Sequence, residues 1–220
     1  MAIRVVLAED NVLLREGVSR LIESEPELEL VAACEDLDSL LLAIEQGEPD
    51  VVVTDIRMPP TGTDEGIRAA AMLRQTRPQT GVVVLSQYAD PAYALALLED
   101  GSGGRAYLLK ERVADVDELL RAIREVAKGG SVIDPKVVEA LVDARTRAAR
   151  SPLARLTPRE GEILGEMAQG RNNASIASHL VLSERAVEKH INSIFSKLGL
   201  TEEADTHRRV KAVLLFLSEQ

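Results

Sequence analysis

The sequence predicts an α/β domain with a doubly wound parallel sheet of the (βα)5 type, followed by a smaller all-α domain. Three observations support this prediction. Short Val-rich apolar runs alternate with longer segments of helical periodicity through the first 130 residues. These runs are apolar throughout, which is typical of parallel strands that helices cover on both faces. In the last third of the chain the strand pattern stops, and only helical segments follow.

In the first domain, each predicted strand is followed by a predicted helix. The strands are expected at residues 3–8, 28–33, 51–54, 82–85 and 106–109. The helices are expected at residues 12–23, 38–46, 65–74, 92–99 and 116–127. The helices of the second domain are expected at residues 158–169, 174–180, 184–198 and 203–217.

Between the two domains, a helical stretch begins near Pro135 and runs into a basic, uniform segment that ends at Ser151-Pro152. Ser-Pro after such a segment is typical of a linker. We therefore expect a first domain over residues 1–130, a helical linker over residues 131–152, and a second domain over residues 153–220.

Charge is distributed unevenly along the chain. Residues 1–150 contain 17 Lys and Arg against 27 Asp and Glu, which accounts for the net charge of −10, whereas residues 151–220 contain nine of each. Nucleic-acid binding would therefore rest on a local basic surface of the second domain. The sequence shows no signal peptide and no membrane-spanning run, and its single cysteine, Cys34, cannot form an internal disulfide. We expect a cytoplasmic protein without a membrane partner.

Polar residues follow four of the five predicted strands. Glu9 and Asp10 follow the first strand, Asp55 the third, Ser86 the fourth and Lys110 the fifth. Since ligands of doubly wound sheets gather beyond the carboxyl ends of the strands, we expect these side chains to converge at one edge. Each residue alone has a plainer interpretation, as a helix cap, a loop acid or a solvated strand end. Their joint placement favours a shared site.

Three carboxylates and one lysine suit a bound Mg²⁺, which prefers oxygen ligands and keeps positions open for water and phosphate oxygens. Asp55 would be the nucleophile that forms an acyl phosphate. Lys110 and the cation would neutralise charge on the phosphoryl oxygens, and Ser86 is placed to hydrogen-bond one of them.

This pattern resembles the receiver domain of response regulators, which has a flavodoxin-like fold. The matching segments are Leu7-Ala-Glu-Asp10, Val52-Val-Thr-Asp-Ile-Arg-Met-Pro59 and Tyr107-Leu-Leu-Lys110. The resemblance covers residues 1 to about 130. It implies that Asp55 is the phosphoacceptor and that Mg²⁺ is held by Glu9, Asp10, Asp55 and the backbone carbonyl of Arg57. It also implies that Ser86, Lys110 and Tyr107 bind the phosphoryl group or move upon phosphorylation, although Tyr107 could simply be a half-buried strand aromatic.

Two loops depart from the receiver pattern. The segment from Pro59 to Gly66 is longer and more polar than the short Pro-Gly turn of the family, and the segment from Gly101 to Gly104 is rich in glycine. Both flank the predicted site, so the resemblance does not carry over a phosphorylation lifetime.

The second domain contains the signature of a helix-turn-helix. Thr157, Pro158 and Glu160 form a capping-box pattern that starts a helix. A short helix, a tight turn and a longer helix capped by Ser183 follow. On the longer helix, an apolar stripe at helical spacing is expected to be buried: Val187, Ile191, Ile194 and Leu198. The opposite face carries polar side chains that either reach into a DNA major groove or are merely solvated: Arg185, Glu188, Lys189, Asn192 and Ser196.

Residues 153 to about 217 resemble a LuxR-type helix-turn-helix. The matches include Leu156-Thr-Pro-Arg-Glu160, Leu182-Ser-Glu184 and Lys197-Leu-Gly-Leu200. Joined to a receiver, this domain is similar to the NarL/FixJ class of response regulators. The resemblance implies a transcription factor that is phosphorylated by a sensor histidine kinase and binds double-stranded operator DNA. Glu188 stands where a basic residue is common in the family, so the base preference does not carry over.

A homodimer is expected because one recognition helix reads only a few base pairs, and paired half-sites require two copies. An apolar stripe on the last helix is either core or partly a dimer contact: Val210, Val213, Leu214 and Leu217.

Two other interpretations stay open at this stage. In the first, Asp55 is the turnover nucleophile of a phosphohydrolase, but the enzymes concerned need a second Asp two residues later, where Arg57 stands. In the second, the receiver is a docking platform that is never phosphorylated. The complete set of pocket residues argues against this platform.

Overall fold

The first domain is built on one parallel sheet. The computed structural model describes residues 2–111, 115–200 and 205–218, without the side chains of residues 148–150 and 205–207. The strands are β1 (Ile3–Ala8), β2 (Leu28–Cys34), β3 (Val51–Asp55), β4 (Gly81–Ser86), β5 (Arg105–Leu109) and β6 (Ser131–Ile133). All pairs are parallel, and the order across the sheet is β2-β1-β3-β4-β5-β6.

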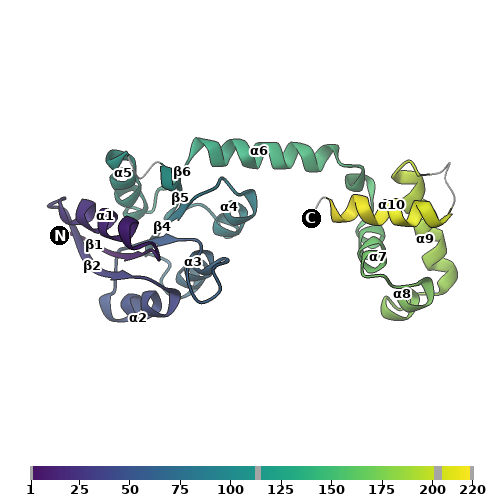
Figure 1. Ribbon diagram of the computed structural model, residues 1–220, viewed down its shortest axis with the longest axis horizontal. Helices are drawn as coiled ribbons and strands as arrows, with labels where there is room; N and C mark the ends of the chain where they lie inside the picture. Colours follow the sequence, from purple (N-terminus) through teal and green to yellow (C-terminus); the bar gives the residue numbers. More distant parts are fainter. Residues whose placement is uncertain (1, 112–114, 201–204, 219–220) are drawn as a thin grey trace. The chain divides into compact units, whose positions relative to one another are not determined.

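Helices cover both faces of this sheet (Figure 1). They are α1 (Val12–Glu23), α2 (Leu37–Gly47), α3 (Glu65–Thr76), α4 (Pro91–Leu98) and α5 (Val116–Ala127). One core layer packs α2, α3 and α4 against the sheet, and the other packs α1 and α5. Successive strand residues alternate between the layers, so that Val52 faces the first and Val53 the second. This is the predicted doubly wound fold, and burial on both faces explains the uninterrupted apolar runs.

The sixth strand was not predicted. β6 pairs with β5 through Ser131, Val132 and Ile133 directly after a Gly-Gly pair. α6 (Pro135–Arg150) follows it, and Val137 at its start is fully buried in the core layer that contains α2, α3 and α4. The chain divides into compact units over Met1–Asp143 and Ala144–Gln220. Residues 131–143, which the sequence patterns assigned to a linker, therefore pack with the first unit.

The second unit is helical. After a 3-10 turn, η2 (Pro152–Arg155), it contains α7 (Pro158–Ala168), α8 (Asn173–His179), α9 (Glu184–Lys197) and α10 (Asp205–Leu217). Its apolar core joins all four helices through residues such as Ile163, Ile176, Ile194 and Ala212. The last helix was predicted to start at Glu203, which lies outside the described residues. The other predicted helix and strand boundaries of the two domains agree with the structure to within two residues.

Candidate functional site

Three carboxylates converge at the carboxyl edge of the sheet. Glu9 and Asp10 follow β1, Asp55 ends β3, and each contributes an oxygen within 4.8 Å of the others. Lys110, directly after β5, donates from Nζ to Asp55 Oδ2 at 2.7 Å and to Glu9 Oε1 at 2.8 Å. The parallel register brings these residues together across 101 positions of sequence.

The electrostatics of this pocket favour an additional cation. Glu9 is fully buried, and burial raises the pKa of its carboxyl group. Burial alone would lower the pKa of Lys110, but hydrogen bonds to Asp55 and Glu9 outweigh it, so the pKa is raised and the ammonium stays charged. Glu9 Oε2 lies 2.8 Å from Lys110 Nζ, and it accepts no further hydrogen bond from the residues that the structure describes. One ammonium does not balance three carboxylates, and a divalent ion suits this donor set.

The carboxylates open into a cavity of about 390 Å³. Its lining joins the ends of β1, β3, β4 and β5: Asp10, Asn11, Leu14, Asp55, Ile56, Arg57, Ser86, Gln87, Tyr88, Asp90, Tyr93 and Lys110. On one wall, the guanidinium of Arg57 lies 5.6 Å from the centroid of the Tyr93 ring. The cavity is thus larger than the carboxylate cluster and extends toward α4.

Ser86 and Tyr107 meet at the loop that follows β4. Ser86 Oγ donates to the carbonyl of Tyr88 at 2.8 Å and accepts from the Tyr88 N–H at 3.2 Å. The Tyr107 hydroxyl donates to the same carbonyl at 3.0 Å. Tyr107 is fully buried, in contrast to the half-buried aromatic considered from the sequence, and burial raises the pKa of its hydroxyl group.

Sequence reasoning missed Glu65, which organises the long loop after β3. This fully buried carboxylate accepts from the N–H groups of Thr61 at 3.0 Å, Thr63 at 2.9 Å and Met58 at 3.4 Å, and from the Thr61 hydroxyl. Burial raises its pKa, but these hydrogen bonds outweigh it and lower the pKa to about 2. The sequence feature that could have revealed this role is a glutamate at a helix start directly after the polar Thr-Gly-Thr-Asp run.

Gly66 allows this loop to pack closely. A Cβ at this position would lie 2.1 Å from the carbonyl oxygen of Asp55. Only glycine permits α3 to begin so near the end of β3. The loop and the phosphoacceptor candidate therefore form one packed region.

In the second unit, Glu160 fixes α7 against α9. The predicted capping box is present, since Thr157 caps the helix and its own N–H donates to Glu160 Oε2 at 2.7 Å. The buried Glu160 carboxylate also accepts from Ser193 Oγ at 2.7 Å and Lys197 Nζ at 2.6 Å. These two contacts with α9 were not predicted.

The turn before α9 has the predicted form. Ser183 caps α9 by accepting from the Ala186 N–H at 3.2 Å. The predicted apolar stripe is buried: Val187, Ile191, Ile194 and Leu198. The opposite face is exposed, as predicted: Arg185, Glu188, Lys189, Asn192 and Ser196. The geometry thus separates a packed face from a polar one that is available to a ligand.

Comparison with known families decides the assignment. Residues 5–124 match the family described as "Response regulator receiver domain", and residues 154–210 match "Bacterial regulatory proteins, luxR family". The chain belongs to the NarL/FixJ class of response regulators. The first match alone spans more than half of the chain.

Relatives and solved structures match this response regulator over most of its length. The transcriptional regulatory protein DegU of Brevibacillus brevis is 36% identical over 217 residues, which cover 91% of this chain and 89% of that protein. The response regulator RcsB of Salmonella typhimurium has a TM-score of 0.65 at 25% identity, covering 98% of this chain and 99% of that one. An RcsB–DNA complex has a TM-score of 0.58 at 25% identity, covering 100% and 99% of the two chains.

The protein is therefore a DNA-binding transcriptional response regulator rather than an enzyme. Two of the relatives are described as transcriptional regulatory proteins, which favours this function over the phosphohydrolase interpretation. In the part of the chain that the structure describes, no helix combines the length and apolar character required to cross a membrane.

Proposed function

We propose that this response regulator is switched by phosphorylation of Asp55, with a sensor histidine kinase as the phosphoryl donor, in the cytoplasm. The observation that carries the proposal is the position of Lys110. Its ammonium lies 2.7 Å from Asp55 Oδ2, and both residues line the cavity. A cation at this distance would stabilise the charge that a phosphoryl group brings to Asp55.

The pocket fits Mg²⁺. We propose that Glu9, Asp10 and Asp55 hold the ion with the backbone carbonyl of Arg57, and the three carboxylate oxygens that lie within 4.8 Å of one another support this assignment. When bound, Mg²⁺ would neutralise the carboxylates and the phosphoryl oxygens. The phosphoryl transfer itself takes place between the donor and Asp55. An Asp55 oxygen forms the O–P bond while the N–P bond of the donor phosphohistidine breaks, and the released imidazole takes up a proton.

The shared acceptor at Tyr88 suggests how phosphorylation is transmitted. A phosphoryl group on Asp55 adds acceptor oxygens beside Ser86, in the same cavity. If the Ser86 hydroxyl donates to one of these oxygens instead, it loses its hydrogen bond to the Tyr88 carbonyl, and the hydrogen bond from Tyr107 to that carbonyl remains. We propose that this exchange shifts the loop after β4 together with Tyr107.

In the second unit, we propose that α9 reads operator DNA with Arg185, Glu188, Lys189, Asn192 and Ser196, and that the protein binds as a homodimer. Of the stripe predicted on α10, three residues are more than half exposed: Val210, Leu214 and Leu217. Val213 packs against the core. An exposed apolar stripe of this kind favours the dimer contact over a purely core role.

Labelling with acetyl phosphate tests the proposed phosphorylation. The wild type should incorporate phosphate only with Mg²⁺ present, and Asp55→Ala should abolish incorporation. Asp64→Ala, which removes a nearby half-buried carboxylate, is the matched control and should label normally. Persistent labelling of Asp55→Ala would refute the assignment of the acceptor.

DNA affinity tests the switch separately. Operator affinity should rise when beryllium fluoride, an acyl-phosphate mimic, is added with Mg²⁺ to the wild type, and Asp55→Ala should not respond. Equal affinities for both proteins under these conditions would favour the docking platform that is never phosphorylated.

A further inference from the structure

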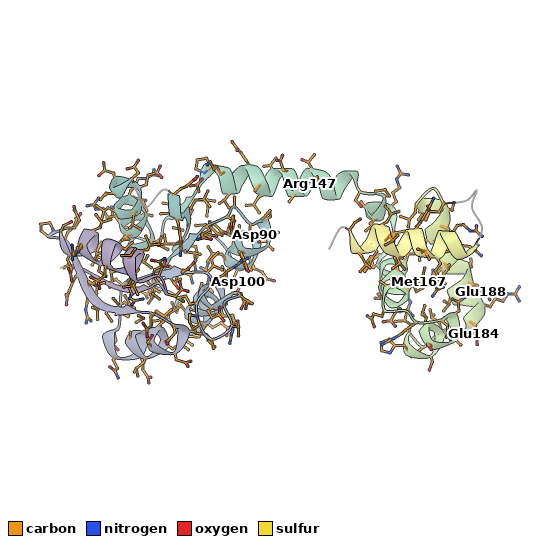
Figure 2. All side chains as sticks on the ribbon, in the orientation of Figure 1. Asp90, Asp100, Arg147, Met167, Glu184 and Glu188 are labelled. Atoms are coloured by element: carbon orange, nitrogen blue, oxygen red, sulfur yellow. The ribbon has the colours of Figure 1, made fainter. Side chains whose placement is uncertain are left out.

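Glu188 places a negative charge on the helix face proposed to meet DNA. It is exposed on α9, together with the other polar residues of that face. In Figure 2, the side chains of Glu184 and Glu188 lie along the outer side of α9. A carboxylate there repels the phosphate backbone, whose neutralisation supplies much of the affinity for DNA. The position of Glu188 therefore requires an explanation other than general DNA affinity.

Helix stability does not explain Glu188. Acidic residues stabilise a helix in its first turn, and Glu184 already occupies that turn. Glu188 lies one turn further along, where the effect of the helix dipole has declined. It also follows Glu184 by four residues, and like charges at this spacing destabilise a helix.

Ion pairing does not explain Glu188 either. Glu188 and Arg209 line one groove of about 520 Å³. The guanidinium of Arg209, however, donates to Asn173 Oδ1 at 3.0 Å and to the Arg171 carbonyl at 2.6 Å. With the residues that the structure describes, Glu188 forms no ion pair. The carboxylates of α7 differ, because each contacts a cation: Glu160, Glu162 and Glu166. Both oxygens of Glu188 thus remain available as acceptors.

We infer that Glu188 is a specificity-determining residue whose carboxylate accepts a hydrogen bond from the amino group of a cytosine in the major groove. This inference rests on the proposed DNA-reading role of α9. A carboxylate only accepts hydrogen bonds, and in the major groove only cytosine and adenine present amino donors. Adenine also presents the N7 acceptor beside its amino group, which would repel a carboxylate. Guanine and thymine present acceptors at their edges, so cytosine is the base that Glu188 fits.

Selection from a randomised DNA duplex tests this inference. The full-length protein is used with Mg²⁺ and beryllium fluoride, and the enriched sequences are compared between variants. The wild type should enrich cytosine at one position of each half-site. Glu188→Ala should lose this preference by roughly 10- to 100-fold while other positions stay fixed. Glu188→Gln should favour adenine there, because a glutamine amide pairs with N6 and N7 of adenine.

Two further variants separate this inference from the role of α9. Glu184→Gln removes a charge four residues away and should leave the cytosine preference intact. Asn192→Ala should alter the preference at a different position if α9 reads DNA. Unchanged preferences in both Glu188→Ala and Asn192→Ala would refute the reading role of α9 and the inference with it. A changed base preference in Asn192→Ala, with an unchanged one in Glu188→Ala, would refute the role of Glu188 and leave the reading role of α9 intact.

Affinity for DNA of unrelated sequence supplies a second readout. Since Glu188 repels phosphates, Glu188→Ala should bind such DNA more tightly than the wild type, while it binds the selected sequence more weakly. A merely solvated side chain would not produce these opposite changes. Weaker or stronger binding to both DNAs alike would overturn the inference.

Discussion

Ser86 and Tyr107 donate hydrogen bonds to one common acceptor, the carbonyl oxygen of Tyr88, at 2.8 and 3.0 Å. If phosphorylation draws the Ser86 hydroxyl toward Asp55, the hydrogen bond from Tyr107 to the Tyr88 carbonyl is the contact that transmits the structural change. The two hydroxyl groups come from neighbouring strands, β4 and β5, and their arrangement depends on the parallel register of those strands.

Tyr107→Phe tests this coupling. The substitution removes only the hydroxyl group, and the Tyr88 carbonyl keeps its bond from Ser86, so the free energy of unfolding should fall by about 1 kcal/mol. Labelling by acetyl phosphate should persist, but the gain in DNA affinity with beryllium fluoride should shrink. Tyr93→Phe is the control, because it removes a hydroxyl that donates to Thr63 instead. A wild-type response in Tyr107→Phe would contradict the coupling.

The sequence predicted the pocket because position after a strand is a local property. Glu9, Asp55 and Lys110 each directly follow or end an apolar run, and a parallel sheet necessarily brings such positions to one edge. The family resemblance added Tyr107 and the carbonyl of Arg57. The geometry of the carboxylates and Lys110 then follows from strand register rather than from any motif.

The features that were missed depend on contacts that sequence periodicity does not encode. β6 has only three residues, so it shows no alternation that would distinguish it from a loop. The partners of Glu65 are mainly backbone N–H groups, whose directions follow from loop conformation. Glu160 was predicted as a local cap, whereas its bonds to Ser193 and Lys197 span 33 and 37 residues.

Glu65→Gln should destabilise the first unit. A glutamine offers one acceptor oxygen, and its NH₂ group would face N–H donors of the loop, leaving buried groups unsatisfied. We expect the free energy of unfolding to fall by about 2 kcal/mol. Urea unfolding followed by tyrosine fluorescence measures this, because the three tyrosines all lie in the first unit.

Asp64→Asn is the matched control for Glu65→Gln. Asp64 is the adjacent acid, but its side chain makes no capping hydrogen bond to α3. Its substitution should change the unfolding free energy by less than about 0.5 kcal/mol. Equal losses in both variants would show that charge in the loop, rather than the hydrogen bonds of Glu65, stabilises this region.

Glu160 should make the stability of the second unit depend on acid pH. Burial raises the pKa of Glu160, but the hydrogen bonds from Lys197, Ser193 and Thr157 outweigh it and lower the pKa from 4.5 to about 2. Because the folded state binds the proton less tightly, the contribution of this carboxylate is complete above pH 4.5 and is lost as the pH falls toward 2.

Glu160→Gln should therefore destabilise the second unit by about 2 kcal/mol at neutral pH and flatten its pH dependence below pH about 5. Urea unfolding followed by far-UV circular dichroism measures both effects. Glu162→Gln is the control on the same helix, because its ion pair with Arg159 is exposed and should contribute less than about 1 kcal/mol. A wild-type pH profile in Glu160→Gln would contradict the assigned cause.

Leu214→Ser should weaken the proposed dimer without unfolding the second unit. Leu214 is 60% exposed on α10, while the buried Ala212 faces the core. A symmetric interface loses the same leucine from both copies, so dimerisation should weaken by about 2 kcal/mol, or roughly 30-fold in Kd. Sedimentation with Mg²⁺ and beryllium fluoride measures the change.

Leu42→Ser is the control for Leu214→Ser, because Leu42 is 54% exposed on α2 in the first unit. It removes the same side chain from a comparable environment and should leave the dimer intact. An equal loss in both variants would indicate a general effect of surface hydrophobicity. An unchanged dimer in Leu214→Ser would assign the contact to another surface and leave the exposed stripe on α10 without this role.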